Sequence, residues 1–378
     1  MLYLLLHWLE ENFQPPGFSA FSYISVRSAL AAITALVISL VIGKRIIIWL
    51  QKMQLSENIR TDIGLDTHLD KAGTPTMGGL IILLATLVPT FLWIKPDNIY
   101  GWLIMFIMLA LGIVGFFDDY IKVIKKDKKG LAGRLKIAGQ VTVGLVLALT
   151  LYFYPPFHAY NTLSTVPFVK NVNIDYAIFG QSLGWLTYIP IVIFIIVAVS
   201  NSVNLTDGLD GLSAGISAIV GISLGILCYV SGRTDFSSFL NILYLPGTGE
   251  LAVFSAAMVG ACFGFLWYNT YPAQVFMGDT GSLALGGAIG AVALMVRKEL
   301  LLPVLGGIFL METVSVIIQT TYFKYTKKKY GDGKRYFLMA PIHHHFEKKG
   351  WPEPKIVVRF WIISILLAVL SIMTLKLR

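Results

Sequence analysis

The sequence predicts an all-α polytopic membrane protein with about ten transmembrane helices in a single domain, residues 1–378. Hydrophobic residues make up 56% of the chain and charged residues only 13%, whereas about a quarter of a soluble domain is charged. Apolar runs of about 20 residues, the length that crosses a bilayer, recur along the chain. The net charge of +9 is then a topology signal, and no nucleic-acid partner is expected.

Ten apolar runs are the expected spans. Their approximate limits are 25–42, 79–93, 100–117, up to 153, 186–199, up to 229, 251–267, up to 296, 300–323 and 357–375. Residues 1–13 are expected to form a short interfacial segment, with no signal-peptide pattern. Residues 155–184 are less apolar and long enough for a small hairpin outside the bilayer.

The positive charges predict how the spans are oriented. Of the 30 lysines and arginines, 22 lie in the loops that follow the odd-numbered spans. Cytoplasmic loops of membrane proteins carry an excess of these residues. The odd-numbered loops are therefore expected to be cytoplasmic and both termini periplasmic.

Asp118 and Asp119 end the apolar run of the third span and precede a lysine-rich loop. Adjacent carboxylates repel each other, and a divalent metal would supply the counter-charge. The alternative is a helix end in water, with Lys122 as the partner of Asp118 four residues earlier. The stretch alone leaves both interpretations open.

Two further motifs follow other spans. Asn204, Asp207 and Asp210 belong to an Asn-x-x-Asp-Gly-x-Asp-Gly pattern near the expected start of a helix. The two acids could share one helix face, and the alternative is that Thr206 or Asp207 caps the helix. Asp279 lies in a Met-Gly-Asp motif and is either another cap or a third metal carboxylate. Three carboxylates without soft ligands would suit Mg²⁺.

Two other polar groups accompany these acids. The run His343–His345 has no matching Cys or His pair, so phosphate binding or proton transfer is favoured over zinc. Lys71 precedes a Gly-Thr-Pro-Thr corner, 73–76, where a phosphate or a base edge could bind. All five constellations lie on the odd-numbered loops, which predicts an active site at the cytoplasmic face. A transporter would instead place ionisable groups near the middle of its spans.

Taken together, these motifs resemble the phospho-N-acetylmuramoyl-pentapeptide transferase (MraY) family of the polyprenyl-phosphate N-acetylhexosamine-1-phosphate transferases. The resemblance covers nearly the whole chain, and its last motif separates this family from relatives that use N-acetylglucosamine. The residues that carry it are 73–79, 118–122, 204–211, 276–279 and 340–347.

The resemblance implies an enzyme that transfers phospho-N-acetylmuramoyl-pentapeptide from its UDP derivative to undecaprenyl phosphate, giving lipid I and UMP. It also implies a multi-pass protein of the bacterial cytoplasmic membrane, in contact with membrane lipid and forming a homodimer. Mg²⁺ is the implied cofactor, with Asp118, Asp119 and Asp279 as the essential acids and metal ligands. Asp118 resembles the base that deprotonates the lipid phosphate, although direct attack and a covalent intermediate both remain open.

The remaining predicted site residues follow the same resemblance. His343 joins the three acids in the predicted catalytic set. The residues predicted to bind substrate are Lys71, Thr76, Lys122, Asn204, Asp207, Gly208, Leu209, Asp210, Asn269, Phe276, Gln319, His344 and His345. Two alternatives are transfer of N-acetylglucosamine phosphate and transport of a lipid-linked sugar.

Overall fold

The protein is described from a computed structural model that covers residues 1–53, 73–125, 130–169 and 172–376. Nearly all of the regular structure in these residues is helical. The helices are α1 (Leu2–Phe13), α2 (Ile24–Lys52), α3 (Gly79–Trp93), α4 (Ile99–Val123), α5 (Gly133–Phe153), α6 (Trp185–Thr206), α7 (Leu212–Ser231), α8 (Thr234–Leu240), α9 (Gly249–Asn269), α10 (Gly278–Met295), α11 (Leu302–Leu305), α12 (Gly307–Tyr330), α13 (Ile342–Lys348) and α14 (Glu353–Met373). The expected hairpin within 155–184 is present, with β1 (Leu163–Thr165) antiparallel to β2 (Asn173–Asp175).

The predicted class, a polytopic helical membrane protein, is confirmed. Among the residues described, eight helices are long and apolar enough to cross a membrane: α2, α4, α5, α6, α7, α9, α10 and α14. The count becomes nine if the bent segment around α12 is one span, and α3 is an apolar helix of only 15 residues. Every predicted run contains a helix, but a total of ten spans stays a prediction.

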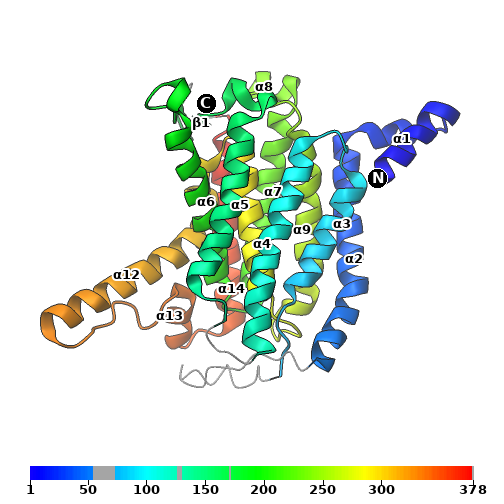
Figure 1. The fold of residues 1–378 in the computed structure, drawn as a ribbon. Coiled ribbons are helices and arrows are strands. Elements are labelled where there is room, and N and C mark those ends of the chain that lie inside the picture. The colour runs from blue at the N-terminus through cyan, green and yellow to red at the C-terminus, as the bar shows by residue number, and fades with distance from the viewer. Residues whose placement is uncertain (54–72, 126–129, 170–171, 377–378) are drawn as a thin grey trace.

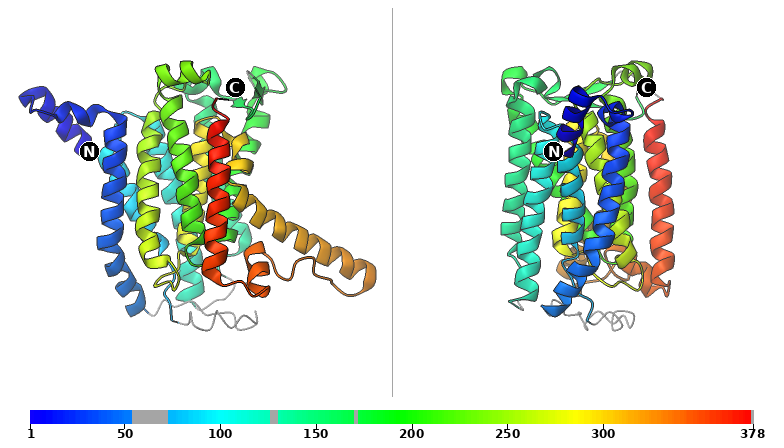
Figure 2. Two further views of the ribbon diagram at one scale, coloured as in Figure 1. Left: turned by 180° about the vertical axis from the view of Figure 1, so that it is seen from behind. Right: turned by 90° about the vertical axis from the view of Figure 1, so that its right-hand side faces the viewer.

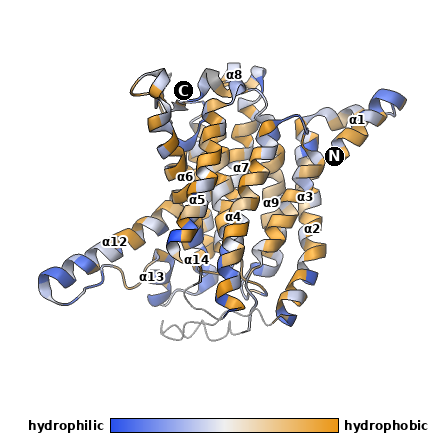
Figure 3. Cartoon of the chain, viewed as in Figure 1, coloured by the Kyte–Doolittle hydropathy of each residue, from blue (hydrophilic) through white to orange (hydrophobic). Residues whose placement is uncertain are grey.

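The long helices form one bundle with α10 at its centre. Figure 1 and Figure 2 show α10 surrounded by its neighbours, and 89% of its apolar window is buried, compared with 28% for α2. Glycines explain the close packing, because Gly286 lies against the α6 backbone at Ser200 and Gly287 against Leu111 of α4. Small residues let helix backbones approach in a membrane, where no hydrophobic force draws helices together. Figure 3 shows hydrophobic residues along the bundle and hydrophilic ones at its ends.

The expected ninth span, 300–323, is not a continuous helix. The chain bends by 80° between the segment Glu299–Leu305 and α12. Gly306 and Gly307 lie at the break, and sharp kinks occur where glycines leave the helix without side-chain support. As a result α12 leaves the bundle and extends away from it (Figure 1).

A buried ion pair fastens the upper end of the bundle in Figure 1. The Arg27 guanidinium in α2 donates to both carboxylate oxygens of Glu250 in α9, at 2.6 and 2.7 Å, and to the Trp93 carbonyl at 3.0 Å. The Lys95 backbone N–H donates to the same carboxylate at 2.9 Å. Both charged side chains are almost completely buried. The pair therefore joins α2, α9 and the end of α3.

Replacing Glu250 with Ala should destabilise the fold strongly, because it leaves the Arg27 charge buried and unpaired. Breaking a buried pair from one side costs ~3–5 kcal/mol. Thermal unfolding of the detergent-solubilised protein measures the effect. Asp235→Ala is the control, since Asp235 pairs with Arg233 at an exposed site, where ion pairs contribute little. Equal, small shifts in Tm for the two variants would contradict the role given to the buried pair.

Candidate active site

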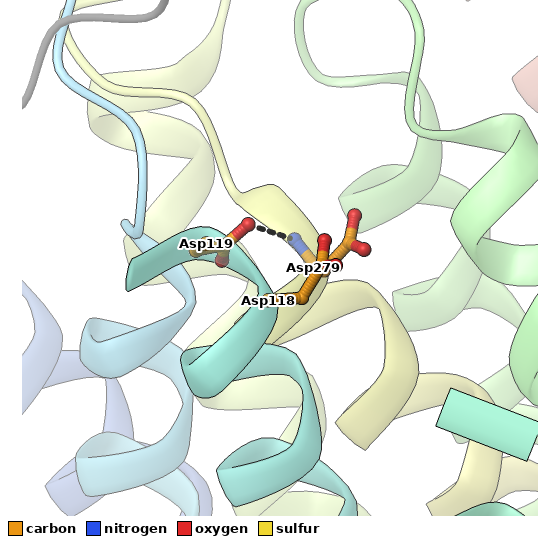
Figure 4. A group of neighbouring side chains, drawn as sticks. All are labelled: Asp118, Asp119 and Asp279. Carbon is orange, nitrogen blue, oxygen red and sulfur yellow. Dashed lines mark hydrogen bonds between the residues drawn. The ribbon is translucent and has the colours of Figure 1, made fainter. Parts of the chain in front are cut away.

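Three aspartates meet where the end of α4 contacts the start of α10. Asp118 and Asp119 lie in the last turns of α4, and Asp279 lies in the first turn of α10. Each offers a carboxylate oxygen, and these oxygens lie within 4.8 Å of one another. Figure 4 shows the Asp118 and Asp279 carboxylates beside each other and the Asp119 carboxylate directed to the backbone nitrogen of Asp279. The alternative interpretation, a helix end in water, is wrong, because both Asp118 and Asp119 are buried.

The Asp119 carboxylate binds the first turn of α10. It accepts hydrogen bonds from the backbone N–H groups of Asp279 (3.1 Å) and Thr280 (2.9 Å) and from the Thr280 hydroxyl (2.6 Å). The first N–H groups of a helix have no partner within the helix and carry partial positive charge. Asp119 therefore caps α10 from another helix, and this capping sets the position of Asp279.

Gly278 makes this capping possible. Its φ is 72°, a conformation that favours glycine, and a side chain there would approach the Asp119 carboxylate and the Thr76 hydroxyl. The helix ends can therefore approach closely enough for the Asp119 carboxylate to reach the α10 backbone.

Two lysines lie between Asp118 and Asp279. Lys122 Nζ is 2.5 Å from Asp118 Oδ2 and 3.4 Å from Asp279 Oδ2. Lys136 Nζ, from the first turn of α5, is 3.0 Å from Asp118 Oδ2 and also pairs with Asp279. The pairing of Lys122 with Asp118 is present, whereas no sequence pattern indicated that Lys136 pairs with the acids.

The arrangement fits a divalent cation. Three carboxylates face two ammonium groups, so the cluster retains one net negative charge if all are ionised. The donor atoms are hard carboxylate oxygens, the ligands that Mg²⁺ and similar cations prefer. The residues that could hold such an ion are Asp118, Asp119 and Asp279.

The Gly-Thr-Pro-Thr corner lies against the loop that precedes α10. The Phe276 N–H donates to the Pro75 carbonyl and the Gly78 N–H to the Phe276 carbonyl, both at 2.8 Å. Thr76, which lies between Pro75 and Gly78 along the chain, is buried, and its hydroxyl is close to Gly278. Two of the predicted substrate-binding residues, Thr76 and Phe276, are therefore brought beside the acids. Lys71, the other predicted residue of this corner, lies outside the described residues.

Asn204 links α6 to the acids. Its Nδ2 donates to Asp279 Oδ1 at 2.8 Å and to the Ser282 hydroxyl at 2.9 Å. The Asn-x-x-Asp-Gly motif therefore reaches the cluster through its first residue.

The rest of this motif is not helical, contrary to the expectation for Asp207 and Asp210. The helix α6 ends at Thr206 and α7 begins at Leu212, so residues 207–211, here called the acid loop, connect them. The two acids share no helix face, and no side-chain cap bond is formed at the start of α7. Gly211 adopts a φ of 78°, which ends the connection in the left-handed region that favours glycine.

The acid loop is fastened to the loop after α9. Asp210 Oδ2 accepts from the Ala273 N–H at 3.0 Å, and Asn269 Oδ1 accepts from the Gly211 N–H at 3.0 Å. Asn269 Nδ2 also donates to the Val275 carbonyl at 2.9 Å. Asp210, Asn269 and Leu209 are all buried. The structure therefore uses Asn269 and Asp210 to join two loops that sequence reasoning had treated only as parts of a pocket.

The three histidines face three different partners. His343 is fully buried, with Nδ1 3.2 Å from Glu312 Oε2. His344 Nδ1 lies 2.5 Å from Glu347 Oε2. His345 Nδ1 accepts from the Leu338 N–H at 3.1 Å. Rings with such different partners are not arranged as a joint metal site.

His345 and Gln319 fasten the segment between α12 and α13. Burial, and then the nearby Lys349 charge, lower the pKa of His345, which favours the neutral ring whose Nδ1 can accept. Gln319 Oε1 accepts from the N–H groups of Tyr336 (3.2 Å) and Phe337 (2.9 Å). Their predicted contacts with substrate stay predictions.

Several residues around the site escaped sequence reasoning. They are Lys136, Thr280, Ser282, Glu312 and Glu353. The two glutamates carry a signal that could have been used, because an acid within or beside an apolar run is costly unless it has a partner. Thr280 and Ser282 lie within three residues of Asp279, but their partners lie on α4 and α6, far away in sequence.

Comparison with known proteins finds relatives along the whole chain. The family described as Glycosyl transferase family 4 matches residues 101–297, and Phospho-N-acetylmuramoyl-pentapeptide-transferase signature 1 matches residues 71–83. Proteins named phospho-N-acetylmuramoyl-pentapeptide-transferase are similar over 100% of both chains. That of Salinibacter ruber is 54% identical over 385 residues, that of Flavobacterium psychrophilum 52% over 410, and that of Chlorobaculum parvum 52% over 378.

Lys136→Met should strengthen cation binding at the three acids, because it removes a positive charge beside Asp118 and Asp279. A unit charge at about 4 Å is worth ~1 kcal/mol even in bulk water, so the affinity for Mn²⁺ should rise at least ~5-fold. Titration followed by Mn²⁺ electron paramagnetic resonance measures this. Lys329→Met, at an exposed lysine of α12, is the control. Unchanged or weaker Mn²⁺ binding by Lys136→Met would show that the acids do not hold the cation.

Proposed function

We propose that this chain, which belongs to the phospho-N-acetylmuramoyl-pentapeptide-transferase family, transfers phospho-N-acetylmuramoyl-pentapeptide from its UDP derivative to undecaprenyl phosphate, giving lipid I and UMP. The observation that carries the proposal is the cluster of Asp118, Asp119 and Asp279 with two lysines, in a chain about half identical to named transferases along its full length. Such a cluster suits a reaction in which phosphates must be held and neutralised.

The proposed setting is the bacterial cytoplasmic membrane. Ten spans result if α3 and the bent segment at α12 each count as one. The lysine and arginine bias then places the acid cluster on the cytoplasmic face and both termini in the periplasm. In support, both chain ends lie toward the upper end of Figure 1, away from the acid cluster. A UDP-linked donor from the cytoplasm and a lipid phosphate could meet at that face. A single domain and a homodimer complete this proposal.

The proposed cofactor is Mg²⁺, held by Asp118, Asp119 and Asp279. When bound, Mg²⁺ would neutralise the negative charge that spreads over the phosphoryl oxygens. Lys122 and Lys136 would hold phosphate oxygens of the two substrates, since each ammonium group already lies between two carboxylates at this point. Both lysine side chains are partly exposed at the edge of the cluster. Each ammonium group can therefore exchange a carboxylate for a phosphate oxygen when a substrate binds.

The chemistry exchanges one phosphoanhydride for another. An oxygen of undecaprenyl phosphate attacks the phosphorus that carries the sugar, the bond to the UMP oxygen breaks, and UMP leaves. Asp118 is the proposed base for the lipid phosphate. Asp119 is less suited, because both of its oxygens accept hydrogen bonds from the first turn of α10. Asp118 differs at one oxygen: Oδ1 accepts from the Leu131 N–H at 2.8 Å, whereas Oδ2 faces the side chains of Lys122 and Lys136, which can be displaced.

The proposed donor site lies around the acid loop and the loop before α10. Asn204 contacts Asp279 directly, so a uridine bound near Asp207, Gly208 and Asp210 would have its pyrophosphate directed toward the acids. The other residues assigned to donor binding are Lys71, Thr76, Leu209, Asn269, Phe276, Gln319, His344 and His345. His343 belongs to the predicted catalytic set, and its contact with the acid loop is described below.

The gathering of polar groups at one end of the bundle favours a transferase over a transporter of lipid-linked sugars. The acids, lysines and amides described above come from α4, α5, α6 and α10 and meet at the same helix ends. Use of UDP-N-acetylglucosamine is a second alternative within the enzyme class.

One assay separates the three functions. Purified protein is incubated with undecaprenyl phosphate and each UDP-sugar, with and without Mg²⁺, and UMP release is measured. We expect Mg²⁺-dependent release from UDP-N-acetylmuramoyl-pentapeptide. Release only from UDP-N-acetylglucosamine would refute the donor assignment, and no release from either donor would refute the transferase proposal.

Asp118→Asn, Asp119→Asn and Asp279→Asn should each lower turnover at least ~100-fold, the scale of losing a charged group that acts in the transition state. For Asp119 the cause is the lost alignment of α10, so Asp119→Asn should also lower Tm. Steady-state rates of UMP release and thermal unfolding measure the two effects. Any of the three variants that keeps near-normal turnover would remove that aspartate from the proposed site.

A further inference from the structure

Two buried glutamates support the acid loop from helices other than α9. Glu353, in the first turn of α14, accepts a hydrogen bond from the Asp210 backbone N–H at 2.6 Å. Glu312 of α12 approaches the same loop through His343, with its Oε2 3.2 Å from His343 Nδ1. Glu353 is only 5% exposed and Glu312 is fully buried. Burying a carboxylate costs free energy, so two buried carboxylates at one loop are expected to have a role there.

His343 transmits the position of Glu312 to the acid loop. Its ring packs directly against Gly208, where an added Cβ would collide with the ring at Nε2. The Glu312 carboxylate lies 3.2 Å from Nδ1 without hydrogen-bond alignment, so packing and electrostatic attraction favour this ring orientation. The backbone N–H of His343 also points to Glu312, at 3.5 Å.

Other residues hold the acid loop to the end of α9 and the loop that follows it. Asn269 accepts from the Gly211 N–H, and the Asp210 carboxylate accepts from the Ala273 N–H. The loop therefore has partners from α9, the loop after it and α14. The two glutamates come from the helix that leaves the bundle and from α14, so they connect the C-terminal part of the chain to the site.

We propose that Glu312 and Glu353 are positioning residues that set the acid loop for binding of the UDP-linked donor, Glu353 through the Asp210 backbone and Glu312 through His343. In this assignment His343 holds the loop and transfers no proton. The inference rests on the proposed role of the acid loop in donor binding. It predicts an effect on the KM of the donor with little effect on the KM of the lipid phosphate, which a role in stability alone would not produce.

Four variants test the proposal in the full-length protein. Glu312→Ala and Glu353→Ala remove the acceptor, whereas Glu312→Gln and Glu353→Gln keep an acceptor of the same shape. Losing a hydrogen bond to a charged group should raise the donor KM of each Ala variant ~10-fold or more. Each Gln variant keeps an acceptor, so its donor KM should stay close to that of the wild type. Asp235→Ala, at an exposed carboxylate at the other end of the bundle, is the control. Donor KM, lipid KM and kcat are taken from UMP release.

Gly208→Ala provides an independent route to the same loop. The added methyl group meets the His343 ring, so the donor KM should rise while Glu312 and Glu353 are intact. Replacing His343 with the smaller Asn in the Gly208→Ala background should recover part of the donor affinity. If His343 instead transfers a proton, the same replacement lowers kcat further with no recovery.

The outcomes separate this inference from the proposed function. If the wild type releases no UMP, the proposed function fails. If the wild type is active but Glu312→Ala and Glu353→Ala leave the donor KM unchanged, or lower only Tm, the positioning role is overturned. A fall in kcat with donor KM unchanged, or an equal rise in the KM of both substrates, would also overturn it. Should an Ala variant fail to fold, Gly208→Ala still decides the Glu312–His343 branch, and Glu353→Asp, which shortens the side chain, decides the other.

Discussion

The capping of α10 by Asp119 is the interaction on which the site depends. A carboxylate buried at the end of α4 would be costly if it had no partners. The first turn of α10 supplies three donors that have no partner within their own helix. The contact requires the two helix ends to approach closely, which explains why positions 115 and 278 are glycines. A side chain at Gly115 would collide with the Asp279 backbone, and one at Gly278 with the Asp119 carboxylate. Once the contact forms, Asp279 is brought to Asp118.

The accumulated negative charge then determines what surrounds it. Lys122 and Lys136 reach Asp118 and Asp279 from two helices, and Asn204 donates to Asp279 from a third. These partners hold the acids together and, when all the groups are ionised, leave one net negative charge, which suits a cation. The same groups that stabilise the cluster are those that phosphates would engage, so the support of the fold and the chemistry of the site share their residues. The acid loop lies next to these groups and is held by Asn269 and Glu353 directly, and by Glu312 through His343.

Much of this arrangement could be predicted from sequence, because apolar runs and polar interruptions follow local rules. The runs located the helices, and the motifs located Asp118, Asp119, Asp279 and Asn204, which do meet. The course of the acid loop was not predictable, because the left-handed turn at Gly211 looks locally like the start of a helix. The break at Gly306 and Gly307 was hidden because apolar residues continue on both sides of it. Lys136, Glu312 and Glu353 have partners far away in sequence, and only the packing of the helices reveals them.

A crystal structure of the protein with Mn²⁺ would test the central claim most directly, that the contact between α4 and α10 builds a cation site for phosphoryl transfer. The account predicts an anomalous peak for an ion coordinated by carboxylate oxygens of Asp118, Asp119 and Asp279. The metal–oxygen distances should be about 2.0–2.2 Å, as is typical of small divalent cations. It also predicts that Asp279→Asn abolishes this peak. A peak elsewhere, or ordered Mn²⁺ that leaves these three carboxylates without a metal, would contradict it.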